Sequence, residues 1–315
     1  MLKQWLNLHN QRNVFALVLG ICIGIFFGTF LNVDDRNDVD EYILKHDVEH
    51  KQNLSNIYVK CVVIVQPSNP KPHKWVSGIV DTYGSKCNRT LFFSHNDKLQ
   101  RQLGDQAEVY TVENSFGSTS YSIFWRIVQF VYNEKSKVKN DTIVWTVFLN
   151  EQNYFVPENL RLLASRYSKE SAVMLGRLQN YRSPFSYIFP FFDYHGFALD
   201  AGIAMSNEAL TKIAQNSCKP GFFSPFYSGK GLLQCANNND ITVVDPVDSE
   251  GYHLFVEKNL RDMFSTGQFG NKEKSFEEAG VKSKCCSDRL ISVGRVAHRD
   301  LRVMEYFAYH VKVAA

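Results

Sequence analysis

The sequence predicts an α/β fold, a mostly parallel sheet flanked by helices, preceded by one transmembrane helix. Apolar, partly β-branched runs at residues 58–66 and 142–149 have the length and composition of strands buried on both faces. Helical patterns lie between and after them: an apolar stripe recurs at helical spacing over residues 122–132, and a proline opens residues 157–167. Strands that alternate with helices indicate a parallel sheet covered on both sides. An uncharged apolar run at residues 14–31 predicts the membrane helix.

The membrane run also predicts the orientation of the chain. Residues 14–31 read VFALVLGICIGIFFGTFL, which is at the short end of what a helix needs to cross the hydrocarbon core. Lys3 and Arg12 precede the run and the acidic stretch DDRNDVDEY follows it, so residues 1–13 are expected to be a cytosolic tail. The alternative is a cleaved signal peptide, whose apolar core is about 7–15 residues long and ends at a small-x-small site. This run is longer and ends in TFLN, which favours a type II anchor.

The remainder divides into a stem and one domain. Residues 32–57 are polar and charged with few apolar positions, and we expect them to hold the domain away from the membrane. Residues 58–315 are expected to fold as that domain, with a short helix at 75–80 and a second strand at 91–94. The net charge of +3 is too mild to indicate a nucleic acid partner.

Cysteines and glycosylation sequons agree with a lumenal domain. Six of the seven cysteines follow the anchor, an even number as a disulfide framework requires: Cys61, Cys87, Cys218, Cys235, Cys285 and Cys286. Three Asn-x-Ser/Thr sequons follow it as well, with glycosylation expected at Asn53, Asn88 and Asn140. Cys22 lies in the anchor and is expected to be a buried thiol. A bridge through Cys22 to a second copy is the alternative, which leaves a homodimer open.

Six stretches, taken in order and with their spacing, resemble the core 1 β1,3-galactosyltransferase family. They are KWVSGIVDTYGSKCNRTLFFS (74–94), FWRIVQFVY (124–132), NYFVPENLRLL (153–163), GFALDAGIAMSNEAL (196–210), CCSD (285–288) and MEYFAYHV (304–311). The resemblance covers residues 61–310 and implies a GT-A-like fold for the domain. It also implies the activity of the family, which is an inverting transfer of galactose from UDP-galactose to GalNAc-Ser/Thr with Mn²⁺.

The loop after the strand at 142–149 is where a sheet of this kind places its chemistry. Active family members carry an Asp-x-Asp motif there, because the Mn²⁺ that neutralises the leaving diphosphate prefers carboxylate oxygens. The corresponding residues here are Asn150, Glu151 and Gln152, so one carboxylate remains. A lone carboxylate on a loop is expected to be a solvated surface residue.

The general base of the family is also replaced. Active members carry a Glu-Asp pair shortly before the cysteine that matches Cys235, and an inverting transfer needs such a carboxylate to accept the proton of the attacking hydroxyl. The matching residues here are Ser228 and Gly229. Asp240 and Asp245 lie downstream of that cysteine at an offset that does not match.

A third departure follows CCSD, where the family has a Ser-Phe-His stretch whose histidine is expected to complete the metal shell. Gly294 stands at that ligand position. His298 lies four residues further on and cannot substitute without a local rearrangement. His195 is expected to be a packed or surface histidine rather than a ligand.

The cysteines, in contrast, match the family. The resemblance implies the pairs Cys61–Cys87 and Cys218–Cys235, and a vicinal bridge between Cys285 and Cys286. Two reduced thiols are the alternative for the vicinal pair. The scaffold is kept while no catalytic or metal-binding residue is expected at the replaced positions, which predicts a pseudoenzyme with no cofactor.

One family member combines this fold with the same losses, and it is a chaperone of the core 1 galactosyltransferase. The resemblance therefore implies a chaperone whose partner is that transferase polypeptide, in the membrane of the endoplasmic reticulum or Golgi. The aromatic segment 181–197 is a candidate contact surface, or else a loop folded over the domain's own core. An active galactosyltransferase with an atypical Mn²⁺ and UDP-galactose site is the alternative, and a lectin-like or structural Golgi protein is a third.

Overall fold

A computed structural model describes Gly20 and residues 56–112, 120–134, 142–181, 194–216, 228–259 and 287–311. The chain divides into two compact units, Met1–Val39 with Asn180–Tyr194, and Asp40–Gln179 with His195–Ala315. Nearly all described residues belong to the second unit, and the architecture below is that of this unit.

A seven-stranded sheet in the order β10-β6-β9-β4-β1-β2-β3 forms its centre. Four strand pairs are parallel, and β9 alone runs antiparallel to its neighbours β4 and β6. The strands are β1 (Ile57–Ile64), β2 (Arg89–Ser94), β3 (Glu108–Thr111), β4 (Ile143–Asn150), β6 (Val173–Gly176), β9 (Ile203–Ser206) and β10 (Thr242–Val244). The predicted α/β fold with a mostly parallel sheet is confirmed.

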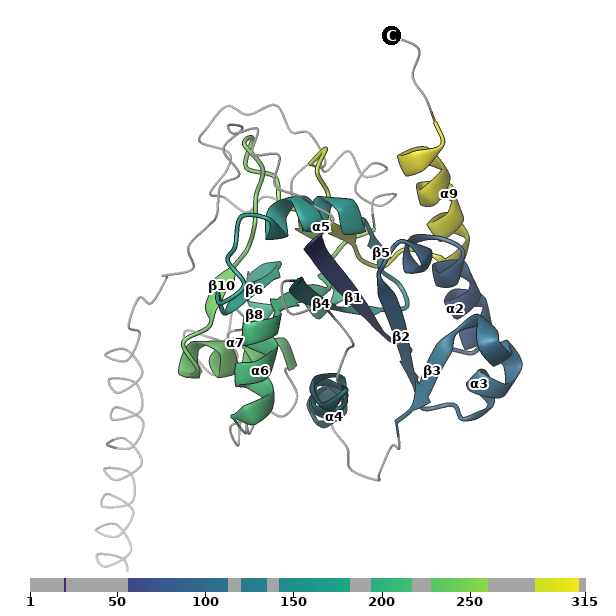
Figure 1. Cartoon of the computed structure of the whole chain (residues 1–315), viewed down its shortest axis with the longest axis horizontal. Coiled ribbons are helices and arrows are strands. Elements are labelled where there is room, and N and C mark those ends of the chain that lie inside the picture. The colour runs from purple at the N-terminus through teal and green to yellow at the C-terminus, as the bar shows by residue number, and fades with distance from the viewer. Residues whose placement is uncertain are drawn as a thin grey trace, which may run out of the picture. The chain divides into compact units, whose positions relative to one another are not determined.

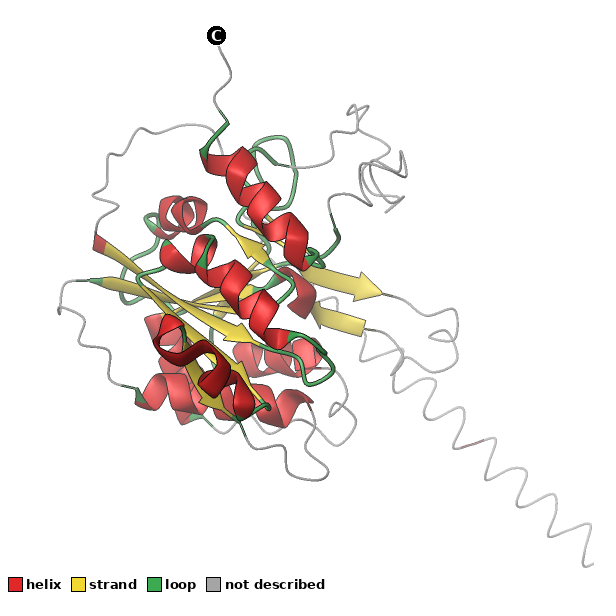
Figure 2. Cartoon of the chain, turned by 90° about the vertical axis from the view of Figure 1, so that its right-hand side faces the viewer, coloured by secondary structure: helices red, strands yellow, loops and turns green. Residues whose placement is uncertain are grey.

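Helices cover both faces of the sheet (Figures 1 and 2). Apolar residues of α2 (Pro72–Val80), α3 (Lys98–Leu103), α5 (Pro157–Ala164) and α9 (His298–Tyr309) share one core cluster. Those of α4 (Ser120–Asn133), α6 (Asn207–Gln215) and α7 (Ser228–Asn238) share a second. β1 contributes to both, because its side chains alternate: Val59 and Val63 face the first cluster and Val62 faces the second. This is why its sequence is a continuous apolar run.

The elements expected from the sequence are present with shifted ends. The helix expected at 75–80 begins earlier, at Pro72, since proline suits a first turn where the missing N–H has no partner to lose. The helix expected at 157–167 ends at Ala164. The backbone amide of Ser165 donates to the carbonyl of Arg161 and caps this end. β1 begins at Ile57, one residue inside the expected stem.

A smaller sheet brings a distant segment to the end of β4. It has the order β11-β12-β5 and consists of β11 (Phe255–Val256), β12 (Ser292–Val293) and β5 (Tyr154–Phe155). β5 follows β4 after a short turn, and β12 pairs antiparallel with it. The residues just after β12 therefore lie next to the loop after β4. The remaining short elements are η2 (Tyr83–Ser85), η3 (Gly104–Gln106), η6 (Leu199–Ala201) and the paired strands β7 (Leu178–Tyr181) and β8 (Tyr194–Phe197).

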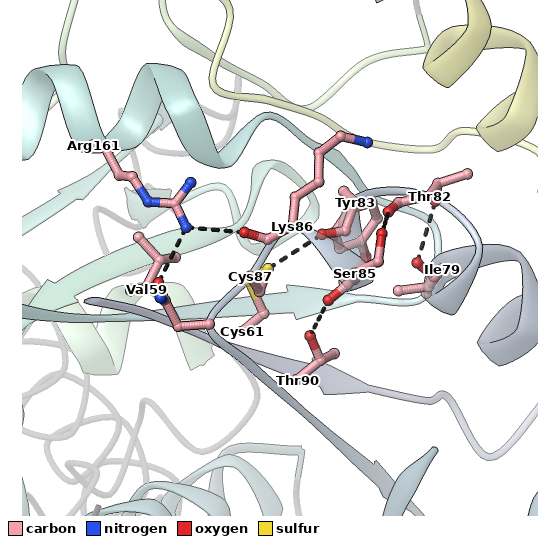
Figure 3. Close-up of a disulfide and its surroundings, with 12 residues drawn as sticks. Val59, Cys61, Ile79, Thr82, Tyr83, Ser85, Lys86, Cys87, Thr90 and Arg161 are labelled. Atoms are coloured by element: carbon pink, nitrogen blue, oxygen red, sulfur yellow. Dashed lines mark hydrogen bonds between the residues drawn. A yellow bond between two sulfur atoms is a disulfide. The ribbon is translucent and has the colours of Figure 1, made fainter. Parts of the chain in front are cut away.

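A disulfide between Cys61 and Cys87 fastens the turn before β2 to the middle of β1 (Figure 3). Their Cα atoms are 6.1 Å apart. Arg161 of α5 reaches the same turn and donates to the carbonyl of Lys86 at 2.9 Å. The pair that the family resemblance implied is thus present, and it lies between the sheet and one helical layer.

Among the described residues, no helix has the length and apolar character needed to cross a membrane. The anchor expected at 14–31 lies outside them except for Gly20, as does the stem up to residue 55.

Candidate functional site

The carboxyl edge of the sheet gathers the polar residues of the candidate site. Strands β1, β4, β6 and β10 run in one direction, so the loops that follow them all begin at this edge. η6 lies at the same edge, since the antiparallel β9 starts where its neighbours end. This edge is where sheets of this type bind ligands.

The loop after β4 is a tight turn held by its own amide side chains. Asn150 accepts a hydrogen bond from the backbone amide of Gln152 at 2.8 Å, and Asn153 accepts one from the amide of Asn150 at 2.7 Å. The carbonyl of Gln152 accepts from Val296 after β12 at 2.8 Å. The amide side chains of Asn150, at one of the family's carboxylate positions, and of Asn153 therefore shape the turn.

Glu151 is buried, so the expectation of a solvated surface carboxylate was wrong. It is 1% exposed. One carboxylate oxygen accepts from the backbone amide of Gln66 at 3.0 Å, and the other accepts from the side chain of Asn69 at 3.3 Å. Burial raises the pKa of the Glu151 carboxyl, and these hydrogen bonds act in the opposite direction. The loop after β1 covers this carboxylate and uses both of its oxygens.

Asp200 of η6 joins the site, and sequence reasoning missed it. Its carboxylate accepts from Nε and Nη2 of Arg295, both at 3.0 Å, and from the side chain of Asn150 at 3.5 Å. Its carbonyl accepts from the buried amide of Asn153 at 2.6 Å. Asp200 and Arg295 are far apart in sequence, so only a three-dimensional structure brings them together.

Gly294, at the position of the family's histidine, has no space for a side chain. A Cβ atom there would lie 2.3 Å from the carbonyl oxygen of Asp200 and 2.8 Å from that of Glu257. His298 is the first residue of α9 and packs its ring edge-on against Trp75, with 5.7 Å between the ring centroids.

Ser228 and Gly229, at the positions of the family's base, form the first turn of α7. This turn lies directly against β8, because a Cβ on Gly196 would be 2.6 Å from the amide nitrogen of Lys230 and 2.7 Å from the carbonyl carbon of Gly229. The neighbouring His195 is half-buried, and burial followed by the charge of Lys230 lowers the pKa of its imidazole. Its Nδ1 atom is enclosed and has no hydrogen-bond partner among the described residues.

A second charged group at this edge was also missed. Asp245, just after β10, is 4% exposed and accepts from Nη1 of Arg177 at 2.9 Å. Its other carboxylate oxygen lies 2.9 Å from Nδ1 of His253. Nε of Arg177 is 3.7 Å from the Glu257 carboxylate. An imidazole held by a carboxylate is a common arrangement for proton transfer, although in this case the guanidinium lies against the same pair.

A known galactosyltransferase is similar in sequence to most of this chain. Over 282 residues the chain is 21% identical to glycoprotein-N-acetylgalactosamine 3-beta-galactosyltransferase 1 of Xenopus laevis, a match that spans 87% of this chain and 72% of that protein. The chain is β1,3-galactosyltransferase-like. No protein-family model matches it.

Solved structures resemble this galactosyltransferase-like chain only remotely. CMP:2-keto-3-deoxy-manno-octonic acid synthetase complexed with CTP matches 61% of this chain and 90% of its own, at 8% identity and a TM-score of 0.36. A mannose-1-phosphate geranyltransferase from Thermus thermophilus matches 50% of this chain and 60% of its own, at 12% identity and a TM-score of 0.31.

The Mn²⁺ ion of the family does not fit the residues of this galactosyltransferase-like chain. Glu151 is enclosed by the loop after β1, Asp200 is paired with Arg295, and Gly294 cannot be replaced by a ligand. Within the described ranges, no group of three or more His, Cys, Asp or Glu side chains is arranged to hold a metal.

The remaining predicted residues of the galactosyltransferase-like chain are only partly described. Cys235 is disulfide-bonded, whereas Cys218, Cys285, Cys286, Asn53 and Asn140 lie outside the described residues. Asn88 is exposed, and its side-chain oxygen accepts from the amide of Val59 at 2.8 Å and from Arg161 at 3.1 Å. The nitrogen that would carry a glycan is not the atom engaged in these two bonds.

Proposed function

We propose that this chain is a non-catalytic relative of core 1 β1,3-galactosyltransferase and acts as its specific molecular chaperone in mucin-type O-glycosylation. The domain would have a GT-A-like fold, the architecture of nucleotide-sugar transferases. Its distant homology to a galactosyltransferase supports the scaffold, and the state of Glu151 supports the loss of catalysis.

The burial of Glu151 is the observation that carries the proposal. A metal-dependent transfer needs carboxylate oxygens that are free to bind the cation beside the leaving diphosphate. The turn after β4 has a single carboxylate, and both of its oxygens already accept hydrogen bonds from the loop after β1. Recruiting Glu151 to a metal would break these bonds and separate two loops.

Retention of the scaffold supports a binding role. The disulfide from β1 and the two core clusters keep the framework of a transferase domain. A protein with the fold of its client can offer surfaces like those through which copies of the client contact one another. The contact surface suggested by the sequence, at 181–197, lies mostly outside the described residues.

The cellular location and membrane topology of the chain are part of the same proposal. We place the chain in the endoplasmic reticulum or Golgi as a type II single-pass membrane protein with its domain in the lumen. The acidic residues after the apolar run and the disulfides of Cys61 and Cys235 are compatible with that compartment.

An active β1,3-galactosyltransferase with an atypical site is the alternative, and the Asp245–His253 contact favours it. A carboxylate oxygen of Asp245 lies 2.9 Å from the imidazole, and such a pair can take a proton from a sugar hydroxyl. In that case UDP-galactose and Mn²⁺ would be needed, and galactose would be added to GalNAc-Ser/Thr.

Refolding of the client tests the chaperone proposal. Denatured core 1 β1,3-galactosyltransferase is diluted into buffer with the purified full chain, and recovered galactosyltransferase activity is measured. We expect recovery well above that with an equal amount of albumin, and co-purification of the two polypeptides. A matched control is the Cys61→Ser/Cys87→Ser variant, whose loosened β1 and β2 should lower the recovery. Recovery no better than with albumin, together with no co-purification, overturns the proposal.

A further inference from the structure

We propose that Arg295 is a built-in cation that takes the place of a divalent metal at the carboxyl edge of the sheet. Its guanidinium donates from Nε and Nη2 to one oxygen of the Asp200 carboxylate, each at 3.0 Å. A guanidinium is always charged and matches a carboxylate in shape, so it neutralises Asp200 without any ion from solution.

Asp200 is the point where three separate chain segments meet. Asn150 and Asn153, from the turn after β4, donate to its carboxylate and its carbonyl. Gly294, from the turn after β12, lies so close to the same carbonyl that a Cβ would be 2.3 Å from it. Joining carboxylates and carbonyls from different loops is what a divalent metal does in a protein. Here the polypeptide makes the junction with its own side chains.

The backbone of Arg295 gives independent support. Its φ of 52° lies in the left-handed region, which disfavours any residue with a Cβ atom. Asp240 is the other non-glycine residue with positive φ among those described, and aspartate tolerates that region better than arginine does. An unfavourable backbone persists where surrounding contacts hold it, and such outliers gather at functional sites. The backbone here is held on both sides, because the amides of Gly294 and Val296 donate to the carbonyls of Val256 and Gln152, and the conformation directs the Arg295 side chain to Asp200.

This role of Arg295 rests on the proposed function for one point, which is the surface that the chain offers to a client. A chain whose site is closed by its own arginine would keep its fold, and thus its surface for a client, at any metal concentration. Both partners are partly exposed, with 62% of the Arg295 side chain and 40% of the Asp200 side chain accessible, so the stabilisation by the pair itself is modest.

Thermal unfolding of the full chain in detergent, with and without millimolar MnCl₂, tests the inference. Mn²⁺ is expected to leave the wild-type Tm unchanged. Arg295→Gln keeps the backbone strain and removes the charge, and should lower Tm by about 1–3 °C in the absence of metal. Mn²⁺ should then raise the Tm of this variant by about 2 °C, because the uncovered Asp200 carboxylate can accept the ion. Arg295→Lys, which keeps the charge, should remain indifferent to Mn²⁺.

Two further variants make the result specific. In Asp200→Asn/Arg295→Gln the Mn²⁺ response should disappear. Arg302→Gln removes a similarly exposed arginine, paired with Asp81 away from the site, and should give no Mn²⁺ response at all. A wild-type Tm that rises with Mn²⁺ overturns the inference, and so does an Arg295→Gln variant that ignores the metal. No client is present in this experiment, so its outcome is separate from that of the refolding assay.

Discussion

The carboxylate of Glu151 accepts a hydrogen bond from the backbone amide of Gln66 at 3.0 Å, across 85 positions of the sequence. The bond ties the loop after β4 to the loop after β1, at the edge where sheets of this type bind ligands. The side chain of Asn69 supplies the second bond at 3.3 Å. The single acidic residue of the turn after β4 is therefore part of the framework.

Stability should depend on pH through Glu151. Burial raises the pKa of this carboxyl in the folded chain, whereas the unfolded chain titrates at the ordinary value of about 4.3. The favourable contribution of the protonated form is present in full below that ordinary value, and it is lost as the pH rises through the raised pKa. Glu151→Gln has no proton to lose. Its free energy of unfolding, relative to wild type, should therefore rise as the pH increases from about 4 through the raised pKa of the wild-type carboxyl.

Denaturant unfolding at a series of pH values measures this difference. The exposed Glu170 supplies a control, since Glu170→Gln should follow the wild-type pH profile. A difference between Glu151→Gln and wild type that stays flat with pH would show that the carboxylate is not buried in the way described.

Restoring the family's histidine at position 294 should damage the fold. The Cβ alone would meet the backbone oxygens of Asp200 and Glu257, and neither oxygen lies on a flexible side chain. We expect Gly294→Ala to lower the free energy of unfolding by about 1–3 kcal/mol, and Gly294→His to lower it at least as much. Urea unfolding measures both. A fully stable Gly294→His variant that gains Mn²⁺ binding would contradict the packing.

The first turn of α7 should be equally intolerant of a larger neighbour. A Cβ at position 196 would be 2.6 Å from the amide nitrogen of Lys230, so Gly196→Ala must push α7 away from β8. The expected loss of stability is about 1–3 kcal/mol, measured by urea unfolding. Gly78→Ala in α2 is a useful comparison, because its Cβ would come no closer than 3.5 Å to a neighbouring atom and its φ is not positive. Equal losses at the two positions would mean that α7 moves freely.

Three strands of the large sheet, β1, β2 and β4, were predictable because their signals are local. The runs at 58–66 and 142–149 had to be strands, since β-branched side chains without alternation suit a sheet covered on both faces. Pro157 marked the start of α5 in the same way. The other strands of this sheet and several helices were not predicted: β3, β6, β9, β10, α3, α6, α7 and α9.

The candidate site was less predictable because its contacts join distant residues. The pairing of Asp200 with Arg295 spans 95 positions, and nothing local marks either residue. Glu151 was expected in solvent because a lone carboxylate on a loop usually is, and only the position of Gln66 shows otherwise. The identity of Gly294 could be read from the sequence, but the lack of space around it could not.

Removing the disulfide of β1 should weaken the whole domain. Cys61 and Cys87 close a loop with a sequence separation of 26, and losing such a link costs about 3 kcal/mol in the chain-entropy picture. The Cys61→Ser/Cys87→Ser variant should unfold at lower denaturant than wild type, as followed by circular dichroism. Reduction of the wild type should lower the midpoint at least as far as in the variant, because it also opens the disulfide of Cys235. An unchanged unfolding midpoint would show that this disulfide does not stabilise the domain.

The proposed function requires that this galactosyltransferase-like domain has no transferase activity. The direct measurement incubates the purified chain with UDP-galactose, Mn²⁺ and a GalNAc-α-Ser/Thr peptide and quantifies the galactose transferred, with active core 1 β1,3-galactosyltransferase as the positive control. We expect no transfer above the level without protein. Turnover that requires Mn²⁺ and vanishes in Glu151→Gln would contradict this expectation.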